Sequence, residues 1–327
     1  MKLLVTGGAG FVGSNLVRLL LRDGVSVSIL NLDLLTYAGD LKNLDEVLAD
    51  PRHSFLQGDI CDGELLLDIL DGVDAVLNLA AESHVDRSIQ DPAPFLRTNV
   101  LGVRTLLDAA RAVGVPRFVQ VSTDEVYGEL DTGDGQNSIG SVEPFTEDSP
   151  LRPRSPYSAS KAGADLLALS YHATFGMDVV IPRGSNVYGP RQHREKLIPR
   201  MAYKVLAGES LPLYGDGQHV RDWIHVDDFC SGILAVLERG RRGTVYNLGG
   251  GEERTNLRVV RDIISVLGGS EDLIRFVTDR PGHDRRYAMN CSKASAELGW
   301  SPAVPFDSGL LQTLAWYRDR WEEVLSL

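Results

Sequence analysis

Two short stretches of this sequence carry side chains that could transfer protons together. The first is Thr123-Asp124-Glu125, which ends the apolar run RFVQVS at residues 117–122. Neighbouring side chains of a strand point to opposite faces, so both carboxyl groups can serve one site only if the chain leaves extended geometry here. The carboxyl end of a parallel strand is where chains turn and where ligands bind. The residues alone leave open a polar loop in which Asp124 caps a turn.

The second stretch is SPYSASKAGADLL, in which Tyr157 and Lys161 lie four residues apart in a helical pattern. This spacing stacks the two side chains on one helix face. A nearby ammonium favours the phenolate, so we expect Lys161 to lower the pKa of Tyr157 from about 10 toward the range of a base. A tyrosine and a lysine at this spacing are also common on exposed helices, so the pair needs support from the segments around it.

A glycine-rich turn near the N-terminus, TGGAGFVGSN, is typical of a dinucleotide-binding site. Gly7, Gly10 and Gly13 follow an apolar run at residues 2–6 and precede a helical pattern. Glycine permits the tight turn and lets the backbone approach a pyrophosphate, to which the helix N-terminus offers N–H donors. A glycine turn without a ligand is the alternative.

Two acidic residues strengthen the dinucleotide interpretation. Asp33 ends the second predicted strand, about 20 residues past Gly13, where such folds use an acid to bind the ribose hydroxyls. Its carboxylate would repel a 2′-phosphate, which favours NAD over NADP. Asp59-Ile60 closes the third strand, where an adenine could lie, although Asp59 could instead cap a helix. After such a half-sheet, the pair of Tyr157 and Lys161 indicates oxidation of an alcohol with NAD.

Strand-like and helix-like segments alternate through the first half of the chain. This alternation predicts an α/β fold with a Rossmann-type doubly wound parallel sheet. The predicted strands are apolar runs at 2–6, 25–31, 74–80 and 117–122, with helix-length segments such as 98–113 between them. Residues 220–240 and 244–250 predict a further helix and a strand that rejoins the sheet. Residues 128–145 have the Gly-, Ser- and Asp-rich composition of a surface loop.

These patterns divide the chain into two domains with a cleft between them. We expect an NAD-binding Rossmann domain from residues 1–182 and 218–248. A smaller, discontinuous substrate-binding domain is expected from residues 183–217 and 249–327.

Composition excludes several classes of protein. The chain has 327 residues with 33 Lys+Arg against 45 Asp+Glu, a net charge of −12. This balance argues against nucleic acid or an anionic membrane surface as a partner, although a local basic pocket could still bind a small anion. Cys61, Cys230 and Cys291 lack metal or disulfide spacing, so we expect no metal and a cytoplasmic location. No apolar run reaches the roughly 18 residues of a membrane span, and glycines interrupt the faintly signal-like N-terminus.

Seven stretches resemble a known family. Together with the glycine turn, they resemble the extended short-chain dehydrogenase/reductases and, more closely, the dTDP-glucose 4,6-dehydratases. Sister families, the 4-epimerases and decarboxylases, share the fold and Tyr-x-x-x-Lys but lack the Thr-Asp-Glu triplet. The stretches are LLTYAGDLKNL (34–44), LAAESHVDRSI (79–89), STDEVYG (122–128), SPYSASKAGAD (155–165), REKLIP (194–199), LPLYGDGQHVRDWIHVDD (211–228) and DRPGHDRRYAMN (279–290).

The resemblance implies a reaction sequence that yields a 4-keto-6-deoxy sugar, a precursor in deoxysugar biosynthesis. Tyr157 would act as base while C4 is oxidised and Thr123 holds the oxygen. Glu125 would then remove the C5 proton while Asp124 protonates the leaving C6 hydroxyl. Two adjacent carboxyl groups in a dry cleft push one pKa upward, which gives the required acid and base. Hydride leaves and returns, so tightly bound NAD is regenerated.

The resemblance also implies the binding residues. The expected cofactor residues are Gly7, Gly10, Phe11, Val12, Gly13, Asp33, Leu35, Thr36, Asp59, Ile60, Leu79, Ala80, Ala81, Ser83, Thr98, Tyr157 and Lys161. The expected substrate residues are Ser83, His84, Thr123, Asn186, Lys196, Leu197, Pro212, Tyr214, Arg221, Asn256, Arg280, His283 and Tyr287. Lys196, Arg221 and Arg280 would offer separated cations to a diphosphate. Taken alone, Arg221 could instead pair with Asp222, and Tyr214 could be core.

Two positions depart from the family pattern. Val187 stands where the family usually has a second asparagine near the nicotinamide, and Arg194 stands where proline is more usual. Three alternatives stay open: a 4-epimerase on the same scaffold, a 4,6-dehydratase of another nucleotide sugar, and a non-catalytic nucleotide-binding regulator. The superfamily also implies a homodimer through helices near Tyr157 and residues 98–113. Leu106, Leu107, Leu166 and Leu167 there could equally be core.

Overall fold

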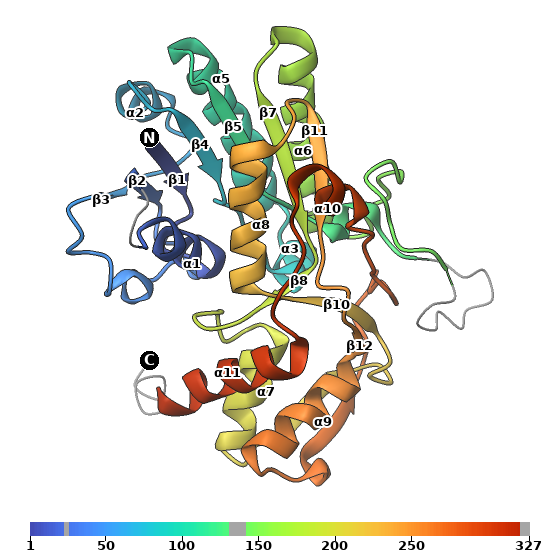
Figure 1. The fold of residues 1–327 in the computed structure, drawn as a ribbon. Coiled ribbons are helices and arrows are strands. Elements are labelled where there is room, and N and C mark those ends of the chain that lie inside the picture. The colour runs from blue at the N-terminus through green and yellow to red at the C-terminus, as the bar shows by residue number, and fades with distance from the viewer. Residues whose placement is uncertain (23–25, 131–141, 321–327) are drawn as a thin grey trace.

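A parallel sheet forms the centre of the molecule (Figure 1). The computed structural model describes residues 1–22, 26–130 and 142–320, and within them this sheet has eight strands. Its order is β11-β7-β5-β4-β1-β2-β3, with β6 paired to β7. The order reverses between β1 and β4, which is where α/β sheets bind ligands. The strands are β1 (Lys2–Thr6), β2 (Ser28–Asp33), β3 (His53–Gln57), β4 (Ala75–Asn78), β5 (Arg117–Gln120), β6 (Ser122–Thr123), β7 (Val179–Gly184) and β11 (Thr244–Leu248).

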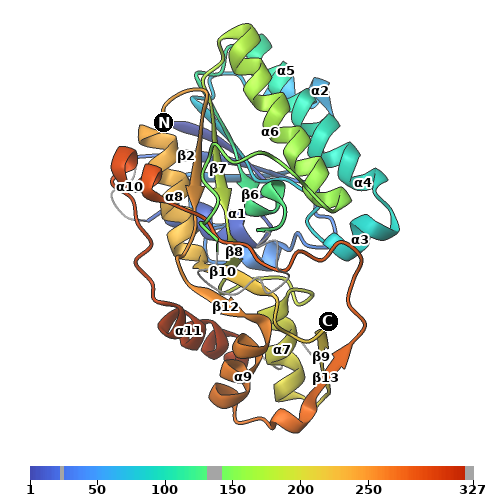
Figure 2. The same ribbon diagram turned by 90° about the vertical axis from the view of Figure 1, so that its right-hand side faces the viewer.

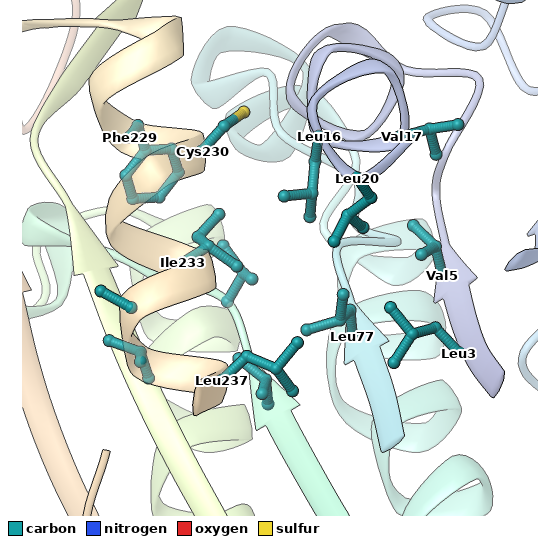
Figure 3. Packing of buried hydrophobic residues seen from close by; sticks show 14 of the residues in the cluster. Leu3, Val5, Leu16, Val17, Leu20, Leu77, Phe229, Cys230, Ile233 and Leu237 are labelled. Atoms are coloured by element: carbon teal, nitrogen blue, oxygen red, sulfur yellow. The ribbon is translucent and has the colours of Figure 1, made fainter. Parts of the chain in front are cut away.

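Helices cover both faces of this sheet, which explains why its strands are nearly continuous apolar runs. On one face α1 and α8 pack against β1 and β4 through residues such as Leu16, Ile233 and Leu77 (Figure 3). On the other face α2, α5 and α6 form a second core. The helices of this part are α1 (Phe11–Leu20), α2 (Gly63–Ile69), α3 (Val85–Gln90), α4 (Ala93–Leu96), α5 (Val103–Val113), α6 (Pro156–Phe175), α8 (Val226–Arg239) and α10 (Ser292–Leu298). The predicted Rossmann-type sheet is confirmed.

A smaller lobe lies beyond the carboxyl ends of the strands (Figure 2). Its core holds Tyr188, Trp223 and Phe306. Its sheets are β12-β10-β8 and β13-β9. The elements are β8 (Asn186–Tyr188), β9 (Leu211–Tyr214), β10 (Val220–His225), β12 (Glu253–Thr255), β13 (Ile274–Val277), α7 (Leu197–Leu206), α9 (Asn256–Leu267) and α11 (Phe306–Asp319).

Short helical turns connect these elements. The helix predicted from residue 98 begins as a π-helical turn that leads into α5. The turns are η1 (Leu41–Leu44), η2 (Arg97–Gly102), η3 (Asp124–Tyr127) and η4 (Glu271–Leu273).

The structure differs from the sequence predictions in the type of one element and in the packing of one helix. The segment predicted as one helix over 220–240 begins as strand β10, which pairs with β8 and β12, and only then becomes α8. All six residues of β10 are buried, so the strand does not alternate between buried and exposed side chains, and its pattern resembles that of a buried helix. Helix α10 packs on α8 and β11, and its Leu298 joins the core of the large sheet rather than the smaller lobe.

Two other predictions concern a surface loop and membrane-spanning helices. Of the loop predicted over 128–145, residues 131–141 lie outside the described residues. In the described parts of the chain, we find no helix that is long and apolar enough to span a membrane.

Candidate active site

The glycine turn packs so closely that side chains are excluded. A Cβ on Gly13 would lie 2.2 Å from the Gly7 carbonyl oxygen, and Gly7 itself has a φ of +70°. Helix α1 begins at Phe11, and its N-cap Gly10 offers no side-chain acceptor to the first-turn N–H groups. Those donors and the helix dipole suit a pyrophosphate. The sequence prediction of a dinucleotide turn therefore has the required backbone geometry.

Asp33 ends β2 and is tied to the backbone of this turn. Its Oδ2 accepts a hydrogen bond from Ala9 N at 2.9 Å, and its Oδ1 accepts one from Leu35 N at 2.8 Å. Burial raises the pKa of Asp33, and the two N–H donors act against that rise. Each carboxylate oxygen keeps a lone pair, so the side chain can still accept from ribose hydroxyls.

We expect Asp33→Ala to release the dinucleotide. The loss of charge-assisted hydrogen bonds should weaken NAD binding roughly tenfold to a hundredfold and relax the exclusion of NADP. The measurement is the nucleotide that stays with the purified protein, together with titration of both dinucleotides. The exposed Asp45→Ala variant is the control and should keep its nucleotide. Unchanged NAD retention in Asp33→Ala would contradict the role given to this carboxylate.

One cavity of about 320 Å³ joins the glycine turn to the predicted catalytic residues. Thr123, Asp124, Glu125, Tyr157 and Lys161 all line it. So do all the predicted cofactor residues except Leu35, whose backbone N–H holds Asp33 instead.

Only part of the predicted substrate site lines this cavity. Ser83, Asn186 and Lys196 do, whereas His84 lines a neighbouring pocket of about 510 Å³ with Arg194. The remaining predicted substrate residues line neither of these two pockets: Leu197, Pro212, Tyr214, Arg221, Asn256, Arg280, His283 and Tyr287.

Four buried polar atoms on the cavity wall have no hydrogen-bond partner among the residues that the structure describes. They are Ser122 Oγ, Asp124 Oδ2, Ser185 Oγ and Asn186 Oδ1. Buried polar groups are normally paired because an unpaired one costs stability, so partners from a ligand are the simplest explanation. Ser122 and Ser185 were not predicted. Ser122 adjoins the Thr-Asp-Glu triplet in sequence, while only the fold brings Ser185 to the cavity.

Helix α6 places Tyr157 and Lys161 at the cavity. Ser155 caps the helix and Pro156 occupies its first turn. The backbone N–H of Tyr157 donates a hydrogen bond to Ser88 Oγ at 3.1 Å. Lys161 Nζ donates to the Val121 carbonyl oxygen at 2.7 Å. Burial lowers the pKa of Lys161 to about 8, so the ammonium still predominates at neutral pH.

The expected effect of Lys161 on Tyr157 is wrong for the protein on its own. Burial raises the pKa of Tyr157 well above its usual value, and Glu125 and Asp124 raise it further. The i,i+4 spacing fixes a shared helix face but says nothing about burial or acidic neighbours. A positive charge placed near Tyr157 would act against this rise in its pKa, and an oxidised nicotinamide ring carries such a charge.

The Thr-Asp-Glu triplet leaves extended geometry as predicted. Strand β6 ends at Thr123, and η3 begins at Asp124. Thr123, not Asp124, caps this turn, and its Oγ1 accepts from Glu125 N at 3.3 Å and donates to Asp124 Oδ1 at 3.2 Å. Both carboxyl groups consequently line one cavity.

The two carboxyl groups have different surroundings. Asp124 is only 2% exposed, and burial, Glu125 and Asp222 raise its pKa well above the usual value. Glu125 Oε2 accepts a hydrogen bond from Ser158 Oγ at 3.2 Å. The raised pKa of Asp124 favours its acid form, and Glu125 beside it is fixed by a hydrogen bond, so the pair can supply an acid and a base.

Basic side chains approach from the smaller lobe. Lys196 Nζ donates to the Ser83 carbonyl oxygen at 2.7 Å. Arg221 donates to the Asp284 carbonyl oxygen at 2.9 Å and stacks over the Tyr287 ring at 4.6 Å. Arg221 therefore does not use Asp222 as its partner, because Asp222 accepts from Glu252 N. The alternative of a simple Arg221–Asp222 ion pair is not what the structure shows.

Further out, Tyr214 and two histidines meet acidic partners. Tyr214 OH donates to Asp86 Oδ2 at 3.0 Å, and it is only partly buried, so it is not a core residue. Within the described ranges, His219, Asp279 and His283 come close enough to suggest a metal site. The two imidazole rings are stacked 3.7 Å apart, however, so their in-plane lone pairs cannot both point at one ion. Each ring instead contacts the Asp279 carboxylate.

The departure at Val187 falls on the cavity wall. Val187 pairs with Ile224 in the sheet of the smaller lobe, and its carbonyl oxygen accepts from Gln192 Nε2 at 2.8 Å. Gln192 also lines the cavity. An amide is therefore present beside Val187, although it comes from another residue.

The fold and this site define a dinucleotide-dependent enzyme of the extended short-chain dehydrogenase/reductase class. The model of the GDP-mannose 4,6 dehydratase family matches residues 4–313. A dTDP-glucose 4,6-dehydratase of Streptomyces griseus is 52% identical, over 99% of this chain and 97% of its own length. The chain belongs to the family of nucleotide-sugar 4,6-dehydratases.

Solved structures agree with this assignment. The crystal structure of DesIV, a dTDP-glucose 4,6-dehydratase from Streptomyces venezuelae with NAD and TYD bound, has a TM-score of 0.94 and 50% identity, covering 99% of this chain and 98% of its own. A UDP-glucuronic acid 4-epimerase from Bacillus cereus in complex with UDP-glucuronic acid and NAD is more distant, with a TM-score of 0.90 and 30% identity over 98% of this chain and 99% of its own. Epimerases therefore share the scaffold at lower identity.

Proposed function

We propose that this protein converts dTDP-glucose to dTDP-4-keto-6-deoxyglucose and water, with NAD as a tightly bound cofactor. The observation that carries the proposal is the pair of adjacent carboxyl groups in the cavity of Tyr157 and Lys161. Alcohol oxidation alone needs neither carboxyl group, whereas elimination of water needs one acid and one base. The family and its relatives support the same reaction.

The first stage is oxidation at C4. Tyr157 takes the proton of the C4 hydroxyl, and Thr123 holds the oxygen with its hydroxyl. The positive charges of Lys161 and of the oxidised nicotinamide together would act against the rise in the pKa of Tyr157 that burial causes. The glycine turn and Asp33 would hold NAD beside these groups. When bound there, the dinucleotide would supply the hydride acceptor for C4 and the hydride donor for C6, so it would be regenerated within each turnover.

The second stage is elimination across C5 and C6. The C4 ketone acidifies the C5 proton, which Glu125 removes. Asp124 gives its proton to the C6 hydroxyl, and the C6–O bond breaks to release water. Once C6 has received a hydride, Glu125 returns a proton to C5. The proton that Tyr157 took from the C4 hydroxyl then replaces the one that Asp124 gave up, so protons and electrons balance.

Three cations of the smaller lobe support a diphosphate as part of the substrate. Burial lowers the pKa of Lys196 and of Arg221, and the positive charge of Arg280 lowers both further. An anion placed among these cations would relieve their repulsion. We therefore assign the nucleoside diphosphate to this lobe, together with Asn256, His283 and the pair Pro212 and Tyr214.

The main alternative is a 4-epimerase, which would share Tyr157 and Lys161. Turnover in deuterated water separates the two reactions, because epimerisation at C4 leaves the C5 hydrogen in place. A non-catalytic regulator would give no product at all. A side-by-side assay of dTDP-, UDP- and GDP-hexoses, read by the alkali-induced absorbance of a 4-keto sugar, identifies the substrate.

A homodimer is supported by apolar side chains on two neighbouring elements. Leu101 on η2 is 56% exposed and Leu166 on α6 is 59% exposed, whereas Leu106 and Leu107 are fully buried core residues. We expect light scattering to give the mass of two chains, and Leu166→Glu to shift it toward one. A single-chain mass for the native protein would contradict the dimer.

The three cysteines, all free, are compatible with a reducing cytoplasm.

A further inference from the structure

A chain of hydroxyl groups links the start of helix α6 to the proposed base. Ser155 Oγ and Ser158 Oγ lie 2.6 Å apart, and Ser158 Oγ lies 3.2 Å from Glu125 Oε2. Ser158 is fully buried and Ser155 is 8% exposed. Bulk solvent therefore has little access to these two hydroxyls.

The direction of each hydrogen bond follows from the donors available. Ser158 donates its single hydroxyl proton to Glu125 Oε2. Ser158 Oγ must then accept from the Ser155 hydroxyl. Ser155 Oγ in turn accepts from Ser158 N at 3.0 Å. Every donor in the chain points toward Glu125, and such chains reinforce one another.

Helix capping does not explain the hydroxyl of Ser158. The N-cap Ser155 bonds the backbone N–H of Ser158, which any residue at that position would supply. The side chain of Ser158 has another use because it points to the carboxyl group of η3. Among the described residues, by contrast, Asp124 receives only the Thr123 hydroxyl on Oδ1 and has no partner on Oδ2.

We propose that Ser158 is a positioning residue for proton removal at C5, because it anchors Glu125 Oε2 and leaves the other oxygen to face the sugar. The inference rests on the proposed dehydration. Since Ser158 follows Tyr157 directly on α6, the same helix turn carries the base for C4, Tyr157, and positions the base for C5, Glu125.

The test uses Ser158→Ala and the near-isosteric Ser158→Cys, whose thiol is a weak donor. Without the full hydrogen bond from Ser158, Glu125 should be misplaced by about 1 Å. It should then remove the C5 proton roughly tenfold to a hundredfold more slowly, while C4 oxidation continues. We expect NADH to accumulate during a single turnover of dTDP-glucose, more in the alanine than in the cysteine variant. A primary isotope effect with C5-deuterated substrate should appear, with KM nearly unchanged.

Ser170→Ala is the matched control, because Ser170 is an exposed serine of the same helix whose hydroxyl bonds only the Leu167 carbonyl oxygen. It should behave as the native enzyme. If both Ser158 variants remove the C5 proton at the native rate and accumulate no NADH, this inference is overturned while the proposed function stands. Equal loss of C4 oxidation and elimination in the cysteine variant would also overturn it, since that indicates a general structural role. If the native protein dehydrates no nucleoside-diphosphate hexose, the proposed function fails first and this inference with it.

Discussion

Replacing Glu125 by glutamine should stop elimination while leaving oxidation of the sugar intact. The amide keeps the size of the side chain but cannot take the C5 proton. We expect overall dehydration to fall by roughly 10²- to 10⁴-fold, which is the usual contribution of a general base. Oxidation at C4 uses Tyr157 and Thr123, so NADH should form in one rapid phase and then persist. The measurement is NADH absorbance together with 4-keto-6-deoxy product in a single turnover.

Two controls separate the base from its neighbour. Glu143→Gln changes an exposed glutamate outside the cavity and should behave as the native enzyme. Asp124→Asn should also block dehydration, but a substrate with fluoride at C6 should restore turnover, because fluoride leaves with less help from an acid. That substrate should not rescue Glu125→Gln. Full turnover by Glu125→Gln would remove Glu125 from the mechanism.

Tyr157→Phe should abolish the reaction one stage earlier. Without the phenol no group takes the C4 proton, so we expect a loss of roughly 10²- to 10⁴-fold in hydride transfer and no transient NADH. The ring remains to pack edge-on against Phe95, so the fold should survive. The assay is the same single turnover, read for NADH and for product.

The matched control is Tyr171→Phe, which removes a hydroxyl from the same helix that bonds Asp108 far from the cavity lining. It should keep native activity. Rapid NADH formation by Tyr157→Phe would show that another group removes the C4 proton. The opposite NADH signals of Tyr157→Phe and Glu125→Gln place the two bases in order.

The residues proposed for catalysis can be singled out from the sequence because their signals are local. Gly13 is identified by the close backbone approach that glycine permits. Asp33 is identified by its place at the end of a strand, and Tyr157 with Lys161 by their helical spacing. The Thr-Asp-Glu triplet was predicted to turn after its strand, and η3 confirms this. Each of these inferences depends on residues close together in the sequence.

Features that depend on tertiary contacts were not predictable in the same way. The bond from Ser158 to Glu125 joins residues 33 positions apart, and Ser185 reaches the cavity only through the order of the sheet. Burial reverses the expected direction of the Tyr157 pKa, because spacing carries no information about water access. Strand β10 was mistaken for helix because a fully buried strand lacks the alternating pattern of an exposed one.

Turnover of dTDP-glucose by the native protein in deuterated water, followed by mass spectrometry and NMR of the product, tests the dehydration directly. We expect a 4-keto-6-deoxy sugar that has lost one water and carries deuterium at C5, with no net change in NAD. A product of unchanged mass with hydrogen retained at C5, or no product from any nucleoside-diphosphate hexose, would contradict it.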